Sequence, residues 1–272
     1  MPTPTGVTDS VVSRDGTAIA YDREGSGPAV ILLSGNLDDG AENEPLAAEL
    51  AAGFTVYNVA RRGRRGSGDA ASYAVEREIE DIAAVMSAAG GAAHLYGVSS
   101  GGALALEAAA AGLPVGRVIV YEVPYSVGPE AAQYWRAYVD ELSRTLAEGR
   151  RGEAVELFMR LAGASEDDIA GARRAPVWAA LERLAPTLAY DAACLGDGEP
   201  PRERLARITQ PTLVATGSAH DPGAPGLPAE FFDIAADEIV AAMPTARRIR
   251  LEGQGHVVAA DRMAAVLRDF LS

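Results

Sequence analysis

The sequence alternates short, strongly apolar runs with longer stretches of helical pattern. The apolar runs cover residues 29–33, 54–59, 93–96 and 115–121. Runs this short, without polar alternation, are typical of strands that are covered on both faces. The alanine-rich or helically spaced stretches between them cover residues 45–52, 75–89 and 101–111. We therefore predict an α/β fold with a doubly wound, mostly parallel sheet.

Both ends of the chain extend this pattern. Residues 7–13 and 18–21 flank a short polar turn and predict a hairpin at one edge of the sheet. Strand and helix patterns alternate again late in the chain, at residues 211–216, 231–242, 246–251 and 261–270. Between 124 and 205, helical stretches follow one another without a convincing strand.

This change of pattern predicts two structural units. We expect residues 1–123 and 206–272 to form the α/β core and residues 124–205 to form an inserted helical cap lobe. The aromatic residues of this lobe are candidates for binding a substrate. They are Trp135, Tyr138 and Trp178. The alternative role for these rings is packing within the lobe itself.

The charge balance limits the partners of this chain. Its 272 residues carry a formal net charge of −14 at pH 7, which disfavours nucleic acids and a polybasic membrane anchor. We expect a small-molecule substrate, no nucleic acid and no membrane partner, and the sequence makes no prediction of the oligomeric state. Every basic residue is arginine, which excludes Schiff-base chemistry on lysine.

The single cysteine and the apolar stretches limit the chain further. Cys194 has no partner for an intramolecular disulfide or for a cysteine cluster that could hold a metal. Residues 1–22 lack a signal-peptide pattern, and no stretch reaches the roughly 18 apolar residues of a membrane span. We therefore expect a cytoplasmic protein that works without a metal or a cofactor.

A glycine-flanked serine joins a predicted strand directly to a predicted helix. The segment Gly97-Val-Ser99-Ser100-Gly101 has the Gly-x-Ser-x-Gly pattern of a nucleophile elbow, a sharp turn that presents a serine hydroxyl. Such a turn strains its central residue and needs small neighbours so that strand and helix approach closely. We predict Ser99 as the nucleophile. The alternative is a glycine-rich turn with an incidental serine.

A serine hydroxyl needs a neutral imidazole to accept its proton. His94 opens the strand that leads to the elbow and lies at its wrong end, so we predict a structural role. His220 is expected to be an exposed loop residue. His256 follows the last predicted strand, at the rim where ligands bind in such sheets. We predict His256 as the base, and the chain order of serine before histidine agrees with this fold.

Two carboxylates compete to orient the imidazole. Asp221 lies in the loop after the strand at 211–216, and Glu122 ends the strand at 115–121 next to the elbow strand. Both positions are at the predicted rim of the sheet. The sequence leaves the choice between Asp221 and Glu122 open.

The alkoxide that develops during attack needs N–H donors. The N–H of Ser100, at the start of the helix after Ser99, is one predicted donor, and the N–H of Asn36 in the loop after Leu33 is the other. A second glycine-rich loop, at residues 61–69, holds four arginines that could bind a phosphate or a carboxylate. For this loop we favour a tight turn with solvated arginines.

Together, the Ser99 elbow, the arginine-glycine loop and the Gly-Gln-Gly-His256 segment resemble the α/β-hydrolase superfamily, across essentially the whole chain. Within it, the chain is similar to small esterases, lactonases and haloperoxidase-like members with a helical cap. The family's usual His-Gly before the oxyanion loop is Ser34-Gly35 here. Asp221 lies one position later than the common Gly-x-x-Asp spacing, and some members place their acid after the earlier strand.

The resemblance implies a serine hydrolase without a cofactor. We expect it to cleave an ester, lactone or thioester of a small to medium apolar molecule through an acyl-enzyme. One alternative is specialised biosynthetic chemistry in the same pocket: cyclisation or release of an intermediate, lyase chemistry or carbon–carbon hydrolysis. The other is a non-catalytic ligand-binding protein that has kept the site.

Overall fold

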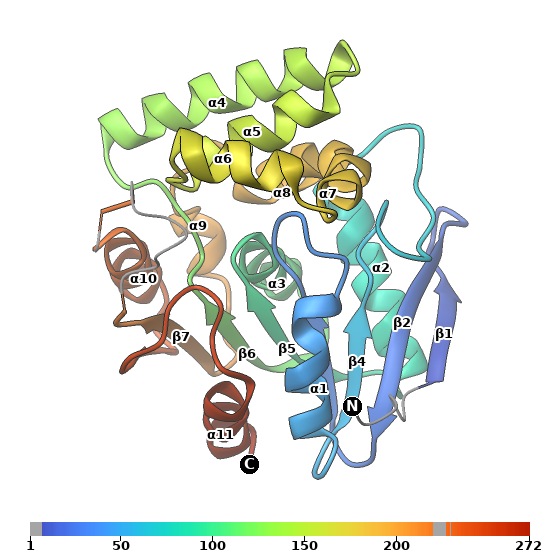
Figure 1. Ribbon diagram of the computed structural model, residues 1–272. Coiled ribbons are helices and arrows are strands. Elements are labelled where there is room, and N and C mark those ends of the chain that lie inside the picture. The colour runs from blue at the N-terminus through green and yellow to red at the C-terminus, as the bar shows by residue number, and fades with distance from the viewer. Residues whose placement is uncertain (1–6, 220–226, 229) are drawn as a thin grey trace.

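One eight-stranded sheet forms the centre of the molecule (Figure 1). In the computed structural model, residues 7–219, 227–228 and 230–272 are described. The strands are β1 (Val7–Val12), β2 (Ala18–Gly25), β3 (Ala29–Leu33), β4 (Thr55–Val59), β5 (Ala93–Val98), β6 (Val115–Tyr121), β7 (Thr212–Gly217) and β8 (Ala246–Leu251). Their order in the sheet is β1-β2-β4-β3-β5-β6-β7-β8. The predicted α/β fold is confirmed.

The sheet is antiparallel at one edge and parallel elsewhere. β1 pairs with β2, and β2 with β4, in antiparallel register, so the predicted hairpin lies at the edge. From β4 to β8 every pairing is parallel. The carboxyl ends of β3, β5, β6, β7 and β8 therefore meet at one rim. The loops that carry the predicted site residues follow these strand ends.

Helices cover both faces of the sheet, as a doubly wound fold requires. On one face lie η1 (Ala41–Asn43), α1 (Glu44–Leu50) and α11 (Ala260–Leu271). On the other lie α2 (Val75–Ala88), α3 (Ser100–Ala110) and α10 (Phe231–Ala242). Successive side chains of β3 pack on opposite faces of the sheet: Ile31 and Leu33 belong to one core cluster, and Val30 and Leu32 belong to the other. Uninterrupted apolar runs are thus explained by burial on both sides.

A run of helices separates β6 from β7. It comprises α4 (Pro129–Ala147), α5 (Arg151–Leu161), α6 (Glu166–Arg174), α7 (Trp178–Leu184), η2 (Ala185–Thr187), α8 (Leu188–Leu195) and α9 (Arg202–Leu205). We call residues 124–205, all of which the structure describes, the helical insertion; they include no strand. In Figure 1 its helices α4 to α8 lie above the carboxyl ends of the strands.

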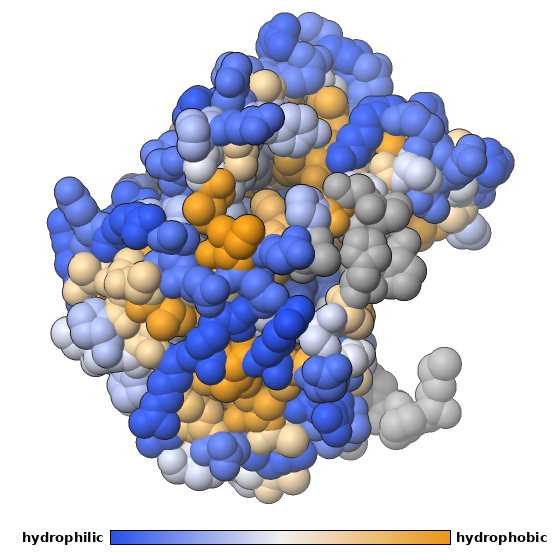
Figure 2. All heavy atoms as spheres, turned by 90° about the vertical axis from the view of Figure 1, so that its left-hand side faces the viewer, coloured by the Kyte–Doolittle hydropathy of each residue, from blue (hydrophilic) through white to orange (hydrophobic). Residues whose placement is uncertain are grey.

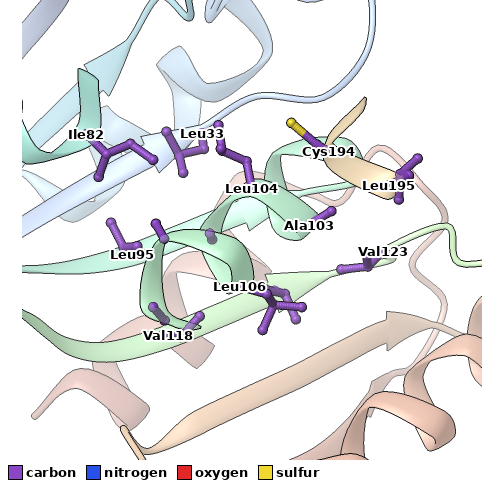
Figure 3. Close-up of a cluster of buried hydrophobic side chains, with 14 of the residues drawn as sticks. Leu33, Ile82, Leu95, Ala103, Leu104, Leu106, Val118, Val123, Cys194 and Leu195 are labelled. Atoms are coloured by element: carbon purple, nitrogen blue, oxygen red, sulfur yellow. The ribbon is translucent and has the colours of Figure 1, made fainter. Parts of the chain in front are cut away.

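The insertion shares the core of the α/β unit through α8. Figure 3 shows Cys194 and Leu195 of α8 beside Ala103 and Leu104 of α3, which in turn packs on the strands. All four side chains are buried. The insertion and the elbow helix α3 therefore form one packed body at this point.

The outer surface is mainly hydrophilic. Figure 2, which faces the side with α10 and α11, shows hydrophilic side chains over most of the surface and apolar ones in separate patches. Helix α11 illustrates the cause, because it buries Met263, Ala264 and Leu267 and exposes its polar residues. Among the described residues, no helix is both long enough and apolar enough to cross a bilayer.

Candidate active site

Ser99 occupies a strained turn between β5 and α3. Its φ of 56° and ψ of −128° lie outside the regions that a serine ordinarily adopts. The close approach of strand and helix requires glycines: a Cβ on Gly97 would lie 2.3 Å from the carbonyl oxygen of Gly101, and one on Gly101 would lie 2.3 Å from that of Leu33. The Ser99 N–H donates to the carbonyl oxygen of Tyr121 at 2.9 Å. The sequence pattern thus forms the geometry that an elbow needs.

The loop after β3 lies against Ser99. A Cβ on Gly35 would be 2.9 Å from Ser99 Cβ and 3.5 Å from its Oγ, so only glycine fits there. The next residue, Asn36, is half-buried, and Leu37 has a positive φ of 53°. Within the described ranges, the N–H groups of Asn36 and Ser100 have no hydrogen-bond partner. Two free donors therefore border the nucleophile candidate.

Glu122 and His256 form a hydrogen-bonded pair after two other strands. The distance between His256 Nδ1 and Glu122 Oε2 is 2.7 Å. The second carboxylate oxygen of Glu122 accepts the N–H of Gly217 at 2.9 Å, and only 4% of Glu122 is exposed. Because a carboxylate only accepts, Nδ1 carries the proton in this pair and Nε2 is left as the basic nitrogen.

Two further contacts support His256. The ring of Phe232 on α10 stacks on the imidazole, with 5.1 Å between centroids and 14° between planes. The hydroxyl of Tyr121 donates to the carbonyl oxygen of Gly255, at 2.5 Å. The sequence interpretation missed Phe232, whose only signal was its place at the start of a predicted helix near the rim. The other acid candidate, Asp221, lies outside the described residues, as does His220.

Backbone strain is concentrated at this rim. Among the described residues other than glycine, those with a positive φ are Leu37, Ser99 and Glu122, which follow β3, β5 and β6. Each such residue costs on the order of 1 kcal/mol or more and persists only where its surroundings hold it. The three strained positions belong to the predicted oxyanion loop, the predicted nucleophile and one predicted acid.

The prediction of solvated arginines in the loop after β4 is wrong for three of the four, and holds for Arg65, which is exposed. Arg61, Arg62 and Arg64 are each at most 2% exposed. Arg61 pairs with Glu78 and Asp191, at 2.8 and 2.6 Å. Burial by itself lowers the pKa of Arg61, but these two carboxylates raise it well above its usual value. The charge of Arg61 is therefore compensated inside the protein. The two partners lie on helices α2 and α8, so the sequence near the loop gives no sign of them.

Asp191 is a second feature that the sequence interpretation missed. This carboxylate on α8 is fully buried, and its Oδ1 accepts from Arg61, from Arg64 at 2.7 Å and from the hydroxyl of Ser100 at 2.8 Å. The available signal was a single acid within the otherwise apolar helical run of residues 188–195. A buried acid in such a position needs cationic partners.

The aromatic residues proposed to bind substrate have structural contacts within the insertion. Trp135 Nε1 donates to the carbonyl oxygen of Gly196 at 3.1 Å, and its ring lies 5.5 Å from that of Tyr138. The guanidinium of Arg173 lies over the Trp178 ring at 5.8 Å. All three rings are buried in the larger core cluster. Their binding of a substrate stays a prediction.

The other described cysteine and histidine side chains, those of Cys194 and His94, are buried or partly buried. Burial raises the pKa of Cys194 to about 12, so the thiol stays protonated near neutral pH. His94 lies against Gly116, where burial lowers its pKa, in agreement with the predicted structural role. Over the part of the chain that the structure describes, no group of three or more His, Cys, Asp or Glu residues could hold a metal ion.

Solved structures of similar fold include several hydrolases. An alpha/beta hydrolase from Sphaerobacter thermophilus DSM 20745 is 45% identical, with a TM-score of 0.85, over 97% of this chain and 100% of that one. A thermophilic esterase from Thermogutta terrifontis is 22% identical, with a TM-score of 0.70, over 97% and 98%. The enol-lactonase from Burkholderia xenovorans LB400 is 23% identical, with a TM-score of 0.69, over 97% and 99%.

Two sequence comparisons complete the picture, and the one with family models agrees with the structural comparison. A search of curated protein sequences finds no significant match. The model of the alpha/beta hydrolase family matches residues 30–269, which is most of the chain. The predicted resemblance is confirmed, and the chain belongs to the alpha/beta hydrolase family.

Proposed function

We propose that this protein is a serine hydrolase that cleaves an ester, a lactone or a thioester of a small to medium apolar molecule. The observation that carries the proposal is the common rim: strained Ser99 follows β5, and the bonded pair of Glu122 and His256 follows β6 and β8. A nucleophile, a base and an acid at one rim of a sheet are the groups that acyl transfer requires.

In the first half of the reaction, Ser99 Oγ attacks the carbonyl carbon while His256 Nε2 takes the hydroxyl proton. Glu122 holds the proton on Nδ1 and stabilises the imidazolium that forms. The N–H groups of Asn36 and Ser100 donate to the oxyanion of the tetrahedral intermediate. The intermediate collapses to an acyl-enzyme on Ser99, and His256 gives its proton to the leaving alcohol or thiol.

In the second half, water repeats these steps on the acyl-enzyme. His256 takes a proton from water as its oxygen attacks the acyl carbon, and the same two N–H groups hold the oxyanion. Collapse breaks the bond to Ser99 Oγ, which recovers its proton from His256. The carboxylic acid leaves, and no redox step or cofactor enters the balance.

The helical insertion is proposed as a cap that encloses the acyl group. Its helices lie above the strand ends in Figure 1, and the rings of Trp135 and Tyr138 are buried in the larger core cluster that the insertion shares with the sheet. The esterases and the enol-lactonase among the structural neighbours favour carboxylic esters and lactones as the first substrates to test.

Labelling with a fluorophosphonate tests the nucleophile. We expect wild type to be labelled once and the Ser99→Ala variant not at all, because the probe phosphonylates an activated serine. Intact-mass spectrometry measures the adduct. Absence of labelling in folded wild type would contradict the proposal and favour a ligand-binding protein.

A panel of p-nitrophenyl esters, lactones and thioesters of increasing acyl length tests the reaction class. We expect turnover of at least one series by wild type and background rates with Ser99→Ala. Labelling without turnover of any member would contradict hydrolysis of simple esters and favour the specialised chemistry.

A further inference from the structure

The loop that carries the proposed Asn36 donor is held from behind by a buried arginine. Arg64 Nη1 donates to the carbonyl oxygens of Gly35 and Asp38, which bracket the turn of this loop. Arg61 Nη1 donates to the carbonyl oxygen of Ser34 at 3.1 Å. Three carbonyl groups of one short loop thus point at two guanidinium ions.

The bond to Gly35 fixes one particular peptide plane. The carbonyl of Gly35 and the N–H of Asn36 belong to the same peptide unit, which is trans like every described peptide bond. In a trans peptide the C=O and N–H point in opposite directions. Because Arg64 draws the carbonyl oxygen into the protein interior, the Asn36 N–H must face the other way.

The same bond changes the strength of the donor. A cation that binds an amide carbonyl polarises the amide and strengthens the hydrogen bond that its N–H gives. Arg64 is 2% exposed, so water screens this effect little. A buried guanidinium is thus well placed both to orient the Asn36 N–H and to make it a better donor to an oxyanion.

Arg64 is itself held by the helical insertion. Asp191 Oδ1 on α8 accepts from Arg64 Nη2 at 2.7 Å and from Arg61 Nη1 at 2.6 Å. The same oxygen accepts the hydroxyl of Ser100, the residue that supplies the other proposed oxyanion donor, at 2.8 Å. One carboxylate oxygen therefore connects both halves of the proposed oxyanion hole. Figure 3 shows the packing of α8 on α3 that holds this helix in place.

We propose that Arg64, anchored by Asp191 of the insertion, is a positioning residue that orients and polarises the Gly35–Asn36 peptide for oxyanion binding. This inference rests on the proposed hydrolase function. It makes the insertion part of the machinery that stabilises the transition state, in addition to any contact with the substrate.

The test uses Arg64→Met in the full chain, with an aryl trifluoromethyl ketone as the transition-state analogue. This ketone forms a tetrahedral adduct with a catalytic serine and places an oxyanion in the hole. We expect kcat to fall by about 10- to 100-fold with little change in KM, since one oxyanion donor contributes about 10²- to 10³-fold. Affinity for the ketone should fall by the same factor as kcat/KM.

Arg62→Met is the matched control. Arg62 is equally buried and pairs with Asp81 at 2.7 Å, but its partners are Asp15, Thr17 and Asp81, which lie outside the oxyanion loop. We expect Arg62→Met to lower the midpoint of thermal unfolding and to leave ketone affinity within about 3-fold of wild type. A parallel loss of ketone affinity in both arginine variants would overturn the inference.

Milder variants keep the inference testable if Arg64→Met does not fold. Arg64→Lys keeps the charge but has no planar fork to reach the loop and Asp191 together, so an intermediate loss is expected. Asp191→Asn should lower kcat and ketone affinity in the same direction, by about 10-fold. Wild-type affinity in both variants would refute the inference while leaving the labelling of Ser99 intact. Failure of wild type to form the adduct would instead refute the proposed function.

Discussion

The two sides of the candidate site are held in different ways. The nucleophile side comprises Ser99, the loop 34–38 and the arginines behind it, where Ser100 is fully buried and Arg61 and Arg64 are 2% exposed. The base side comprises Glu122, His256 and Phe232, where the His256 side chain is 32% exposed. The first side is fixed by several buried ionic contacts. On the second side, the imidazole itself is held by its hydrogen bond to Glu122 and by the stack of Phe232, and the hydrogen bonds of Gly217 and Tyr121 hold the residues around it.

This difference matches what each side would have to do. An oxyanion hole works only if its donors are fixed before the reaction, because reorganising them would cost much of their effect. A base must reach the nucleophile, then the leaving group and then water, so its ring benefits from some freedom at the solvent edge. Two parts of the site are therefore complementary: the buried ionic cluster, which consists of Arg61, Arg64, Glu78 and Asp191, and the partly exposed His256.

The largest expected effect tests whether the two sides act as one unit. Ser99→Ala and His256→Ala should each lower kcat by about 10⁵- to 10⁶-fold, and the double variant should lose no more. Steady-state rates on the best ester from the panel measure this. Losses that multiply in the double variant would mean that the two residues act independently. This would contradict the view that the two sides form one catalytic unit.

The second effect concerns the acid on the base side. Glu122→Gln should lower kcat by up to about 10⁴-fold, because an amide does not stabilise the imidazolium or fix its tautomer. Asp221→Asn is the matched control, and we expect less than about a 10-fold loss, within the range of a residue that does not orient the base. The reverse order of effects would identify Asp221 as the acid.

The third effect compares one glycine on each side. Gly97→Ala should lower the free energy of unfolding by about 3 kcal/mol, because its Cβ would overlap the Gly101 backbone. Gly255→Ala, in the loop that carries His256, should change it by less than about 0.5 kcal/mol, since no atom lies within 4 Å of the added carbon. Urea unfolding curves measure both. Equal costs would contradict the contrast in rigidity.

The smallest effect concerns the ring beneath His256. Phe232→Leu should lower kcat about 5-fold, which corresponds to the roughly 1 kcal/mol of an aromatic stack. Phe232→Tyr keeps the ring and should stay close to wild type. An unchanged kcat in Phe232→Leu would show that Glu122 alone positions the imidazole.

Much of this arrangement was predictable because its signals are local. The strands that are buried on both faces left continuous apolar runs, and the elbow left glycines next to Ser99, where strand and helix nearly touch. His256 was identifiable by its place after the last strand. Local spacing also narrowed the choice of the acid to Asp221 and Glu122. We propose Glu122, because its carboxylate is hydrogen-bonded to His256 Nδ1.

The buried ionic cluster could not be predicted from local sequence patterns. Arg61 finds Glu78 17 residues away and Asp191 130 residues away, so whether its charge is solvated depends on tertiary packing. An arginine-glycine loop looks the same in sequence whether its side chains face water or the interior. The stack of Phe232 on His256 likewise joins two segments whose proximity only the fold creates.

The place of Asp191 has a consequence for exchanging the helical insertion between relatives. The insertion leaves the sheet after β6 and returns at β7, and these strands are neighbours, so a foreign lobe could be grafted without altering strand register. A graft that lacked a carboxylate at this point of α8 would leave Arg61 with Glu78 as its acidic partner and would remove the ion pair that Arg64 makes with Asp191. Chimeras designed to change selectivity should therefore keep this single acid fixed while every other lobe position is varied.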